Sequence, residues 1–484
     1  MLHFKTIYDF FDFLYIFQSR KFDIKYYKHL NPDVDRKKVN PIWHYVRHGW
    51  HEGRNPCRWF STYDYLKANP DIEAAGINPF VHYLRFGKKE NRTLSPNSWQ
   101  DWYQARKDNP WNPVSSTLPV GLNLVGFFST AKGIAEAARS TIKALNTTEI
   151  NYSIINFESS IPDDLKTLPL PTANFLNKFA YNTNLIHVNP PEMPLVWQNY
   201  SKQNLTGRYT IGVWYWELPD FPADWLFAFN LVDEVWVGSR FIEQSLTKHS
   251  TVPVRLIPPC IEVDVDETLN RLFFNLPQDR FLYLCAYDVA STSARKNPQG
   301  AIDAYLKAFP NPTNQTGLVI KVNASKNSFD QLSTLEEKIS HREDIFLINK
   351  QLSRTEMNTL IDLTDVYVSL HRAEGFGLIP AEAMYLGKPV IMTNWSGNTD
   401  LMTGDNACGV TYQLVPIKDQ QGPYPSGGTW AEPDIEHAAF FMKRLMSDKD
   451  YYQCISQKAS FHIRHNFSPE RIGSLIKQRL LDIQ

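Results

Sequence analysis

From residue 120 onward, short apolar segments alternate with amphipathic ones, and this alternation constrains the fold more than any other feature. The apolar segments have the composition of buried strands, whereas the segments between them show the apolar spacing of helices. Strands that alternate with helices predict parallel sheets, because parallel neighbours need a long crossover connection. We expect strands at 120–128, 184–189, 209–214, 234–237 and 254–258, and a second series at 281–286, 318–322, 345–348, 366–370 and 389–392.

The two series predict an α/β fold with two Rossmann-like, doubly wound domains, since a chain of 484 residues is too long for one core. We expect the first domain at 118–265, the second at 266–465, and a C-terminal helix at 466–484. That helix is predicted to begin at Ser468-Pro469, a cap followed by proline. Because ligands bind beyond the carboxyl ends of parallel strands, the two domains are expected to face a shared cleft.

A repeat with an offset of 38 residues opens the chain, with copies at about residues 22–56 and 60–94. Matching positions include Asn31 and Asn69, Asn40 and Asn78, His44 and His82, Gly49 and Gly87, and Arg54 and Arg92. Proline after Asn40 and Asn78 is typical of a helix start, and the glycines are typical of a helix end. Residues 1–105 are therefore expected to form a small α-helical repeat module. Because His44 and His82 recur as repeat positions, we interpret them as structural and not as metal ligands.

Composition excludes several classes of protein. With 50 basic against 51 acidic side chains, the chain lacks the positive excess of a nucleic-acid binder. Its five cysteines are far apart and predict neither a zinc site nor a disulfide framework. No secretory signal and no apolar run long enough to span a membrane are evident. These features favour a cytoplasmic protein, and the aromatic helix expected at 6–18 leaves open a peripheral attachment at the inner face of the membrane.

The segment from His371 to Glu382 is the most informative for function. The expected strand 366–370 leads into a Gly-Phe-Gly turn, which is followed by a helix-like run. A strand, a glycine turn and a helix N-terminus together present free backbone N–H groups to an anion. Two carboxylates, Glu374 and Glu382, frame this turn, which suits a ligand that carries both phosphates and hydroxyls. A nucleotide sugar is such a ligand.

This segment resembles the E-x7-E motif of the retaining GT-B glycosyltransferases, glycosyltransferase family 4, and the similarity extends from about Pro119 to the C-terminus. Arg295-Lys296-Asn297-Pro298 resembles the basic turn that holds the donor diphosphate in that family. The segment 126–133 resembles the first loop of its N-terminal domain. Residues 430–434 (Trp-Ala-Glu-Pro-Asp) and 396–398 (Ser-Gly-Asn) resemble features of its bacterial surface-polysaccharide subgroup. The chain departs from the family at 396–400, where many relatives carry Gly-Gly-x-Pro-Glu.

The resemblance implies a role for each matching residue. Expected catalytic residues are Glu374, Lys296 and Arg295, and expected donor-binding residues are Glu382, Gly375, Phe376, Gly377, Leu378, Gly133 and Arg372. Candidates for contact with the acceptor or sugar are Asn189, His187, Glu217 and Trp214, with Trp216 beside them. Fixed cations stabilise the charge that develops on a leaving diphosphate. No metal or other cofactor is therefore expected, and Asp264-Val-Asp266 and Asp33-Val-Asp35 are not interpreted as metal sites.

The expected function is a retaining hexosyltransferase of the EC 2.4.1 type. It would move a hexose from a nucleotide-diphosphate sugar, GDP-mannose-like as the first guess, to a glycan or lipid-linked glycan in polysaccharide or O-antigen-type biosynthesis. Polysaccharide-assembly proteins are possible partners of residues 1–105, and nucleic acid is not an expected partner. Two alternatives stay open: a non-catalytic GT-B scaffold that binds partners through its repeats, and a GT-B sugar-nucleotide epimerase.

Overall fold

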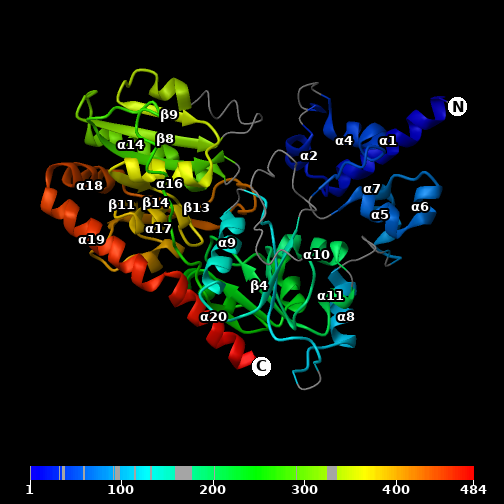
Figure 1. Cartoon of the computed structure of the whole chain (residues 1–484). Helices are drawn as coiled ribbons and strands as arrows, with labels where there is room; N and C mark the ends of the chain where they lie inside the picture. The colour runs from blue at the N-terminus through cyan, green and yellow to red at the C-terminus, as the bar shows by residue number, and fades with distance from the viewer. Residues whose placement is uncertain are drawn as a thin grey trace. The chain divides into compact units, whose positions relative to one another are not determined.

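The computed structural model describes residues 2–31, 33–34, 39–57, 60–90, 92, 99–113, 116–130, 133–157, 177–200, 202–289, 292–323 and 335–483. The chain forms two compact units. An N-terminal unit comprises Met1–Asp108 and Pro194–Gln203, and a main unit comprises Asn109–Met193 and Asn204–Gln484 (Figure 1). In the described part of the chain, no helix is both long and apolar enough to cross a membrane.

The N-terminal unit is helical, as expected. Its elements are α1 (Leu2–Ser19), α2 (Ile24–Leu30), α4 (Pro41–His44), η1 (Tyr45–Gly49), α5 (Thr62–Ala68), α6 (Pro70–Ala74), α7 (Pro79–His82), η2 (Tyr83–Gly87) and α8 (Trp99–Asp108). Asn40 and Asn78 each accept hydrogen bonds from two backbone N–H groups of the helix that follows. The predicted asparagine caps are therefore present in both copies of the repeat.

The recurring histidines bind tyrosines. His44 Nδ1 shares a hydrogen bond of 3.0 Å with the hydroxyl of Tyr27. His82 Nδ1 makes the same contact with Tyr65 at 2.8 Å. Burial lowers the pKa of both imidazoles, so each is neutral near pH 7. These contacts agree with the structural interpretation of the two histidines.

The recurring glycines have a different role from the one expected. A Cβ atom at Gly49 would lie 2.0 Å from the hydroxyl of Tyr27, and one at Gly87 would lie 2.3 Å from that of Tyr65. Neither glycine has a positive φ. The segments η1 and η2 do end at these glycines, as predicted, but it is the close approach of a tyrosine that requires glycine at these positions.

Helix α1 contacts both copies through equivalent arginines. Asp9 pairs with Arg47 at 3.4 Å, and Asp12 pairs with Arg85, 38 residues further along, at 3.8 Å. Ile16, also on α1, is fully buried in the core of this unit. The aromatic helix thus packs on the repeats of its own unit.

The first domain of the main unit has a parallel six-stranded sheet of order β2-β1-β3-β4-β5-β6. Its strands are β1 (Leu122–Gly126), β2 (Tyr152–Asn156), β3 (Thr183–His187), β4 (Tyr209–Trp214), β5 (Glu234–Val237) and β6 (Val254–Leu256). Its helical segments are α9 (Gly133–Leu145), η4 (Pro190–Glu192), α10 (Met193–Asn199), α11 (Lys202–Leu205), η5 (Ala223–Leu231) and α12 (Arg240–Thr247). Residues 194–203, within α10 and α11, belong to the N-terminal unit. Only β2 was not predicted among these strands.

The second domain has a parallel six-stranded sheet of order β12-β11-β10-β7-β8-β9. Its strands are β7 (Phe281–Asp288), β8 (Thr316–Asn323), β9 (Ile345–Asn349), β10 (Val366–Ser369), β11 (Val390–Thr393) and β12 (Cys408–Val410). Its helical segments are α13 (Ser293–Lys296), α14 (Pro298–Ala308), α16 (Arg354–Leu363), α17 (Leu378–Tyr385), η7 (Gly397–Leu401), α18 (Ile435–Ser447) and α19 (Lys449–Asn466). Strand β12 and an antiparallel hairpin, β13 (Tyr412–Pro416) with β14 (Thr429–Pro433), were not predicted. The two parallel sheets confirm the predicted fold class.

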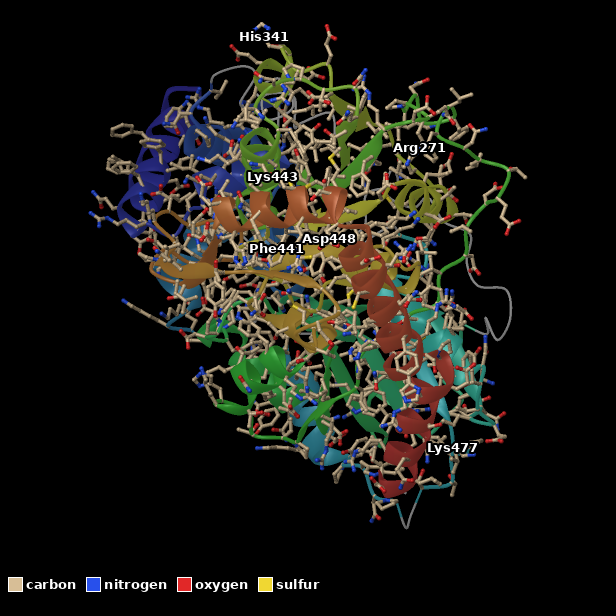
Figure 2. The ribbon with its side chains drawn as sticks, turned by 90° about the vertical axis from the view of Figure 1, so that its left-hand side faces the viewer. Arg271, His341, Phe441, Lys443, Asp448 and Lys477 are labelled. Carbon is tan, nitrogen blue, oxygen red and sulfur yellow. The ribbon has the colours of Figure 1, made fainter. Side chains whose placement is uncertain are left out.

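The chain returns to the first domain at its C-terminal end. Asp448 ends α18 and caps α19, and Lys477 lies on the last helix, α20 (Pro469–Ile483) (Figure 2). Helix α20 packs on α9, where Ile472 and Ile476 join the buried core of the first domain (Figure 1). The predicted helix start is correct, and the helix belongs to the first domain's core.

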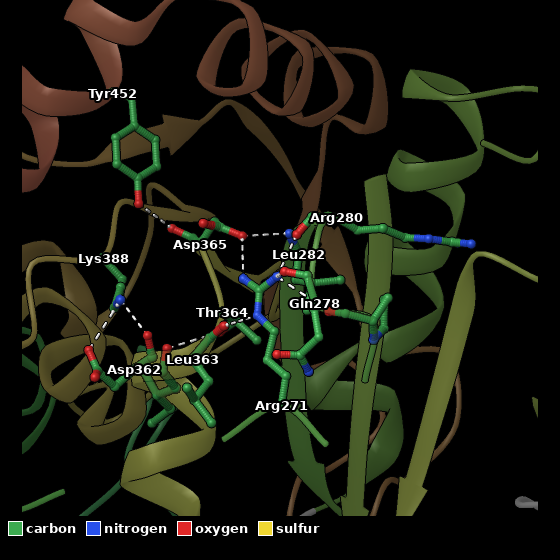
Figure 3. A network of polar contacts seen from close by, with 12 residues as sticks. Arg271, Gln278, Arg280, Leu282, Asp362, Leu363, Thr364, Asp365, Lys388 and Tyr452 are labelled. Carbon is green, nitrogen blue, oxygen red and sulfur yellow. Dashed lines mark hydrogen bonds and ion pairs between the residues drawn. The ribbon is translucent and has the colours of Figure 1, made fainter. Parts of the chain in front are cut away.

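Arg271 attaches the interdomain link to the second domain (Figure 3). Its guanidinium donates to the backbone carbonyls of Leu363 and Arg280 at 2.8 and 2.7 Å, and lies 3.1 Å from the carboxylate of Asp365. Asp365 also accepts from the backbone N–H of Leu282 at 2.7 Å. The arginine therefore holds the amino ends of β7 and β10 together, at the edge opposite the carboxyl ends where a ligand site is expected.

Candidate active site

Lys296 and Glu374 form the centre of the site. They follow β7 and β10, which are neighbours in the sheet, so their carboxyl ends lie side by side. The Lys296 ammonium donates to Glu374 Oε1, and Arg295 Nη1 lies 3.4 Å from Oε2 of the same carboxylate. Two segments that the sequence predicted separately are thus joined by ion pairs.

The Glu374 carboxylate is ionised although it is buried. Burial alone would raise its pKa, but the charges of Lys296 and then Arg295 hold the pKa to about 2. Arg295 is itself only 5% exposed, and its nearby anions keep its pKa raised in spite of burial. The site is therefore a desolvated cluster in which Lys296 and Arg295 surround Glu374, and Glu217 also lies close enough to raise the pKa of Arg295.

Backbone contacts fix the basic turn against the motif. Arg295 Nη1 donates to the carbonyl of Ala373 at 2.7 Å, and the backbone N–H of Arg372 donates to the carbonyl of Arg295 at 2.7 Å. Asn297, with a φ of +50°, caps α14 and donates its amide to the carbonyl of Leu370 at 2.8 Å. These contacts place the two cations without help from a ligand.

The glycine turn ends at an uncapped helix N-terminus. Gly377 precedes α17 with a φ of +91°, a conformation that favours glycine. No described side chain caps the first turn of α17, so its N–H groups suit an anion. The ring of Phe376 is buried in the core, 5.7 Å from the ring of Phe467, and so only its backbone could meet a ligand. Leu378 also packs against that core.

The loop that departs from the family pattern supports this turn. Ser396 has a φ of +74°, where the relatives' glycine would be unstrained, and its hydroxyl accepts from the backbone N–H of Glu374 at 2.9 Å. The Gly397 N–H donates to the carbonyl of Glu374 at 2.9 Å, and a Cβ there would lie 1.9 Å from the carbonyl oxygen of Gly375. The loop therefore binds both the backbone N–H and the backbone carbonyl of Glu374.

Glu382 lies one turn into α17 and is 3% exposed. Its Oε1 is paired with Arg354 Nη2, from the first residue of α16. Its Oε2 is buried and has no hydrogen-bond partner within the described residues. Sequence reasoning missed Arg354, because no local pattern links residue 354 to residue 382.

Arg372 does not face a ligand as predicted. Its guanidinium forms a two-point ion pair with Glu432 of β14, at 2.6 and 2.9 Å, and donates to the carbonyl of Ala294 at 2.6 Å. The predicted donor contact by this side chain is therefore wrong, because all three contacts hold the hairpin and the basic turn together. Gly133 begins α9 with no described atom within 4 Å of a Cβ there, whereas Ala131 and Lys132 of the same loop lie outside the described residues.

Two candidates of the first domain are core residues. Trp214 is fully buried beside the rings of Phe221 and Phe229, so its predicted sugar contact is wrong. His187 is 2% exposed and lies beneath the sheet edge, 3.3 Å from the hydroxyl of Thr141. Burial lowers the pKa of His187 to about 3, so it is neutral and is not placed for an acceptor contact.

The other two candidates have protein partners. Asn189 Oδ1 accepts from the backbone N–H of Tyr215 at 2.9 Å. Glu217 Oε2 accepts from the hydroxyl of Tyr424 at 3.0 Å, and Trp216 is buried with its ring 5.5 Å from the ring of Tyr424. Glu217 therefore joins the two domains of the main unit.

Tyr424 is the second residue that sequence reasoning missed. It lies between β13 and β14, is 4% exposed, and has its ring 5.8 Å from the guanidinium carbon of Arg295. Burial raises its pKa well above the usual value, so the hydroxyl stays protonated and donates to Glu217. A tyrosine in a Gly/Pro-rich loop carries no signal that would have indicated this position.

His371 is a buried neighbour of the cluster. Burial lowers its pKa to about 4, so it is neutral near pH 7. Neither ring nitrogen makes a regular hydrogen bond to a described atom, although Asn398 lies close enough to raise the pKa slightly. This side chain offers no proton donor at neutral pH beyond a single N–H.

A metal site was not expected, and the structure gives the acidic pairs other contacts. Asp264 lies 3.6 Å from Lys143 Nζ, and Asp266 accepts from Thr268 at 2.6 and 2.9 Å. Asp33 pairs with Arg54 at 2.9 Å, whereas Asp35 lies outside the described residues. Across the residues that the structure describes, no group of three or more His, Cys, Asp or Glu side chains could hold a metal ion.

A comparison with protein families matches the part of the chain that carries this site. Residues 284–415 match the family described as Glycosyl transferases group 1. The matched range contains both cations, Lys296 and Arg295, and both carboxylates, Glu374 and Glu382. It does not include the hairpin strand β14 or α20.

Solved structures show the same fold. The chain is similar to Anabaena HepE in complex with UDP and glucose (14% identity, TM-score 0.53, covering 75% of this chain and 100% of that one). It is also similar to the sucrose-phosphate synthase of Thermosynechococcus elongatus (15%, 0.54, 75% and 99%) and to a glycosyltransferase of Rickettsia africae (15%, 0.53, 76% and 99%). These similarities confirm the GT-B fold.

One curated relative is the trehalose synthase of Rubrobacter xylanophilus, with 22% identity over 182 residues. The similarity covers 37% of this chain, and it spans only 38% of that enzyme's length.

Proposed function

We propose that the protein is a retaining glycosyltransferase that moves a hexose from a nucleotide-diphosphate sugar to a hydroxyl of a glycan or lipid-linked glycan. The observation that carries this proposal is the cluster of Lys296, Arg295 and Glu374 beside the uncapped N-terminus of α17. Its two cations suit a diphosphate, and its carboxylate suits sugar hydroxyls. No metal or other cofactor is part of the proposal.

In the proposed donor complex, the diphosphate lies against Lys296, Arg295 and the first N–H groups of α17. An ammonium has three N–H donors, so Lys296 can keep its bond to Glu374 and still donate to phosphate oxygens. Glu374 accepts from hydroxyls of the hexose, and Glu382 accepts from the ribose. The donor would then hold its anomeric carbon above the loop that follows β10.

The proposed reaction is a front-face displacement. The C–O bond between the anomeric carbon and the diphosphate breaks while the acceptor oxygen forms a bond on the same face of the sugar. The leaving diphosphate takes the proton of the acceptor hydroxyl, so no protein base is required. Lys296 and Arg295 stabilise the charge that develops on the diphosphate, and a fixed donor of this kind contributes about 2.7–4 kcal/mol. Glu374 and Glu382 hold the donor and form no covalent intermediate.

The identity of the donor can be tested directly. GDP-mannose is our first choice of donor, and the HepE complexes, one with UDP-glucose and others with UDP, make UDP-hexoses an equal first test. The purified chain is incubated with each nucleotide sugar, and the released nucleoside diphosphate is measured with and without glycan acceptors. Proton NMR of the product would show whether the anomeric configuration of the donor is retained. No turnover with any hexose donor, or inversion, would count against the proposal.

The N-terminal unit is proposed to bind polysaccharide-assembly proteins or to guide a long glycan, in a pathway of surface-polysaccharide biosynthesis at the inner face of the membrane. Three phenylalanines of α1, Phe10, Phe11 and Phe17, are at least half exposed, which supports an interaction surface there. A chain without residues 1–105 tests this role. Unchanged partners, unchanged membrane recovery and unchanged activity on long acceptors would contradict it.

A further inference from the structure

We infer that Arg354 is a donor-positioning residue that orients the Glu382 carboxylate toward the ribose and connects it to the first loop of the opposite domain. The inference rests on the proposed function, since it assigns Glu382 to the ribose of the donor. It adds a residue outside the E-x7-E motif and predicts a preference for ribonucleotides. Figure 1 shows α16, which begins with Arg354, and α9, which carries its partner in the first domain.

The position of Arg354 is set by its helix. Ser353 caps α16 by accepting from the backbone N–H of Glu356 at 3.1 Å, and Glu356 accepts in return from the backbone N–H of Ser353 at 2.7 Å. This capping box fixes the first residue of α16, which is Arg354. Helix α16 contacts α17, so the guanidinium reaches Glu382 without leaving its own domain.

The pairing leaves one carboxylate oxygen for a ligand. Arg354 Nη2 occupies Oε1 of Glu382, and Oε2 is buried with no described partner. A buried carboxylate oxygen without a hydrogen-bond partner costs free energy unless a donor reaches it. A ribose hydroxyl aimed at Oε2 would supply that donor, whereas a 2'-deoxyribose would lack one of the two neighbouring hydroxyls. Arg354 therefore orients the carboxylate and leaves its free oxygen for the ribose.

The same guanidinium also faces the first domain. Arg354 Nε lies 4.0 Å from Oε2 of Glu136 on α9, and Glu136 Oε1 pairs with Arg139 at 2.6 Å. Arg139 in turn donates to the carbonyls of Phe128 and Thr130 at 2.9 Å each. Burial would raise the pKa of Glu136, but Arg354 and Arg139 hold that pKa below its usual value, so Glu136 is an anion between two cations.

These contacts form one continuous chain of charges from Glu382 through Arg354, Glu136 and Arg139 to the loop after β1. That loop borders the proposed acceptor side of the cleft. A donor ribose that binds Glu382 would therefore also bias the position of Arg354 toward Glu136. In this way occupancy of the nucleotide site favours an ordered first loop.

The test compares nucleotides that differ only at the ribose. Titration calorimetry measures the binding of UDP and 2'-deoxy-UDP, and of GDP and 2'-deoxy-GDP, to the full chain. We expect the ribonucleotide that binds to do so about 10- to 100-fold more tightly than its deoxy analogue, the range of one hydrogen bond to a charged group. Arg354→Met should reduce this ratio to about threefold or less, and Arg354→Lys should restore part of it. The double variant with Glu382→Gln should lose no more than either single variant, because both act on one contact.

Hydrogen exchange tests the connection between the domains. Saturating nucleotide should protect the backbone amides of residues 126–130 in the unmodified protein but not in Arg354→Met or Glu136→Gln. Arg444→Met, an exposed arginine on α18, serves as the matched control and should behave like the unmodified protein. Circular dichroism and thermal unfolding of each variant establish that it is folded.

The outcomes distinguish failure of the role of Arg354 from failure of the proposed function. A folded Arg354→Met that keeps the full ribose ratio would overturn the inference and leave the proposed function intact. Unchanged protection of residues 126–130 in that variant would overturn the connection to the first domain. If the unmodified protein binds neither UDP nor GDP, the proposed function fails, and the ribose role of Glu382 fails with it.

Discussion

The ammonium of Lys296 donates to the carboxylate of Glu374, although the two residues lie 78 positions apart in the chain. The contact exists because β7 and β10 are adjacent in the sheet, and both residues follow the carboxyl ends of these strands. The ammonium has three N–H donors. Lys296 can therefore bind a second anion and still keep its ion pair with Glu374. In the proposed donor complex, the pair would therefore bind a diphosphate with little rearrangement.

Replacement of Lys296 by alanine should lower kcat by about 100- to 1,000-fold, because one fixed donor to the leaving diphosphate is lost. Steady-state kinetics with the donor identified above would measure the loss. Lys338→Ala removes an exposed lysine that pairs with Asp303 and should leave kcat unchanged. A folded Lys296→Ala protein with full turnover would refute the assignment.

Glu382→Ala should chiefly weaken donor binding. We expect the donor KM to rise by about 10- to 100-fold, because the ribose loses a charged acceptor, whereas kcat should change much less. Glu337→Ala, at an exposed position, is the matched control. A fall in kcat with an unchanged KM would place Glu382 at the reacting atoms instead of at the ribose.

The stability of the second domain should depend on the charge of Glu374 in acid. The folded-state pKa of this carboxylate is about 2, below its ordinary value of 4.5. Its contribution to stability is therefore present above about pH 4.5 and is lost as the pH falls toward 2. The thermal midpoint measured between pH 6 and pH 3 should fall more steeply for the unmodified protein than for Glu374→Gln. Parallel curves would show that the ion pairs add no pH-dependent stability.

Arg271→Met should destabilise the second domain by about 3 kcal/mol, because it leaves a partly buried Asp365 without its cation and frees several backbone carbonyls (Figure 3). Denaturant unfolding followed by tryptophan fluorescence would measure the change. At low temperature the donor KM should be unaffected, since Arg271 lies at the opposite ends of the strands from the site. A raised KM in a fully folded protein would contradict this separation.

Gly49→Ala should destabilise the N-terminal unit by about 1–3 kcal/mol, because the new Cβ would overlap the hydroxyl of Tyr27. Tyr27→Phe removes that hydroxyl and should recover part of the loss in the double variant. Limited proteolysis and hydrogen exchange of residues 22–56 would measure both effects. If alanine at Gly49 is tolerated with Tyr27 intact, the close approach does not explain the glycine.

Local patterns were sufficient where the physics is local. The caps at Asn40 and Asn78, the start of α20 at Pro469 and the glycine at position 377 each follow from hydrogen bonds or backbone angles within a few residues. Buried strands of the two parallel sheets are also recognisable locally, because burial requires a short run of apolar residues. Strands β2 and β12 lie at sheet edges and were missed because β2 contains polar residues and β12 is only three residues long. The hairpin of β13 and β14 was missed because β13 is largely exposed and mixed in composition.

The site residues were predicted with less success than the strands and helix caps. Glu374, Lys296 and Arg295 come together as expected, whereas Trp214 and His187 were wrongly expected at the cleft. A strand end is a position along the chain, but whether its side chain points to the cleft or to the core depends on the pleat and on the helices that cover the sheet. Residue type alone does not settle that direction.

The sequence by itself determined the two parallel sheets, the glycine turn between the carboxylates and the basic turn, because period, caps and turn residues are encoded within short segments. Only the tertiary structure decided which of these segments meet. It brought Arg354 to Glu382, Tyr424 to Arg295 and Arg372 to Glu432, pairs that the chain keeps far apart. The physical reason is that an ion pair or a ring contact acts over a few ångströms in space, and that distance depends on strand order and crossovers, not on separation along the chain.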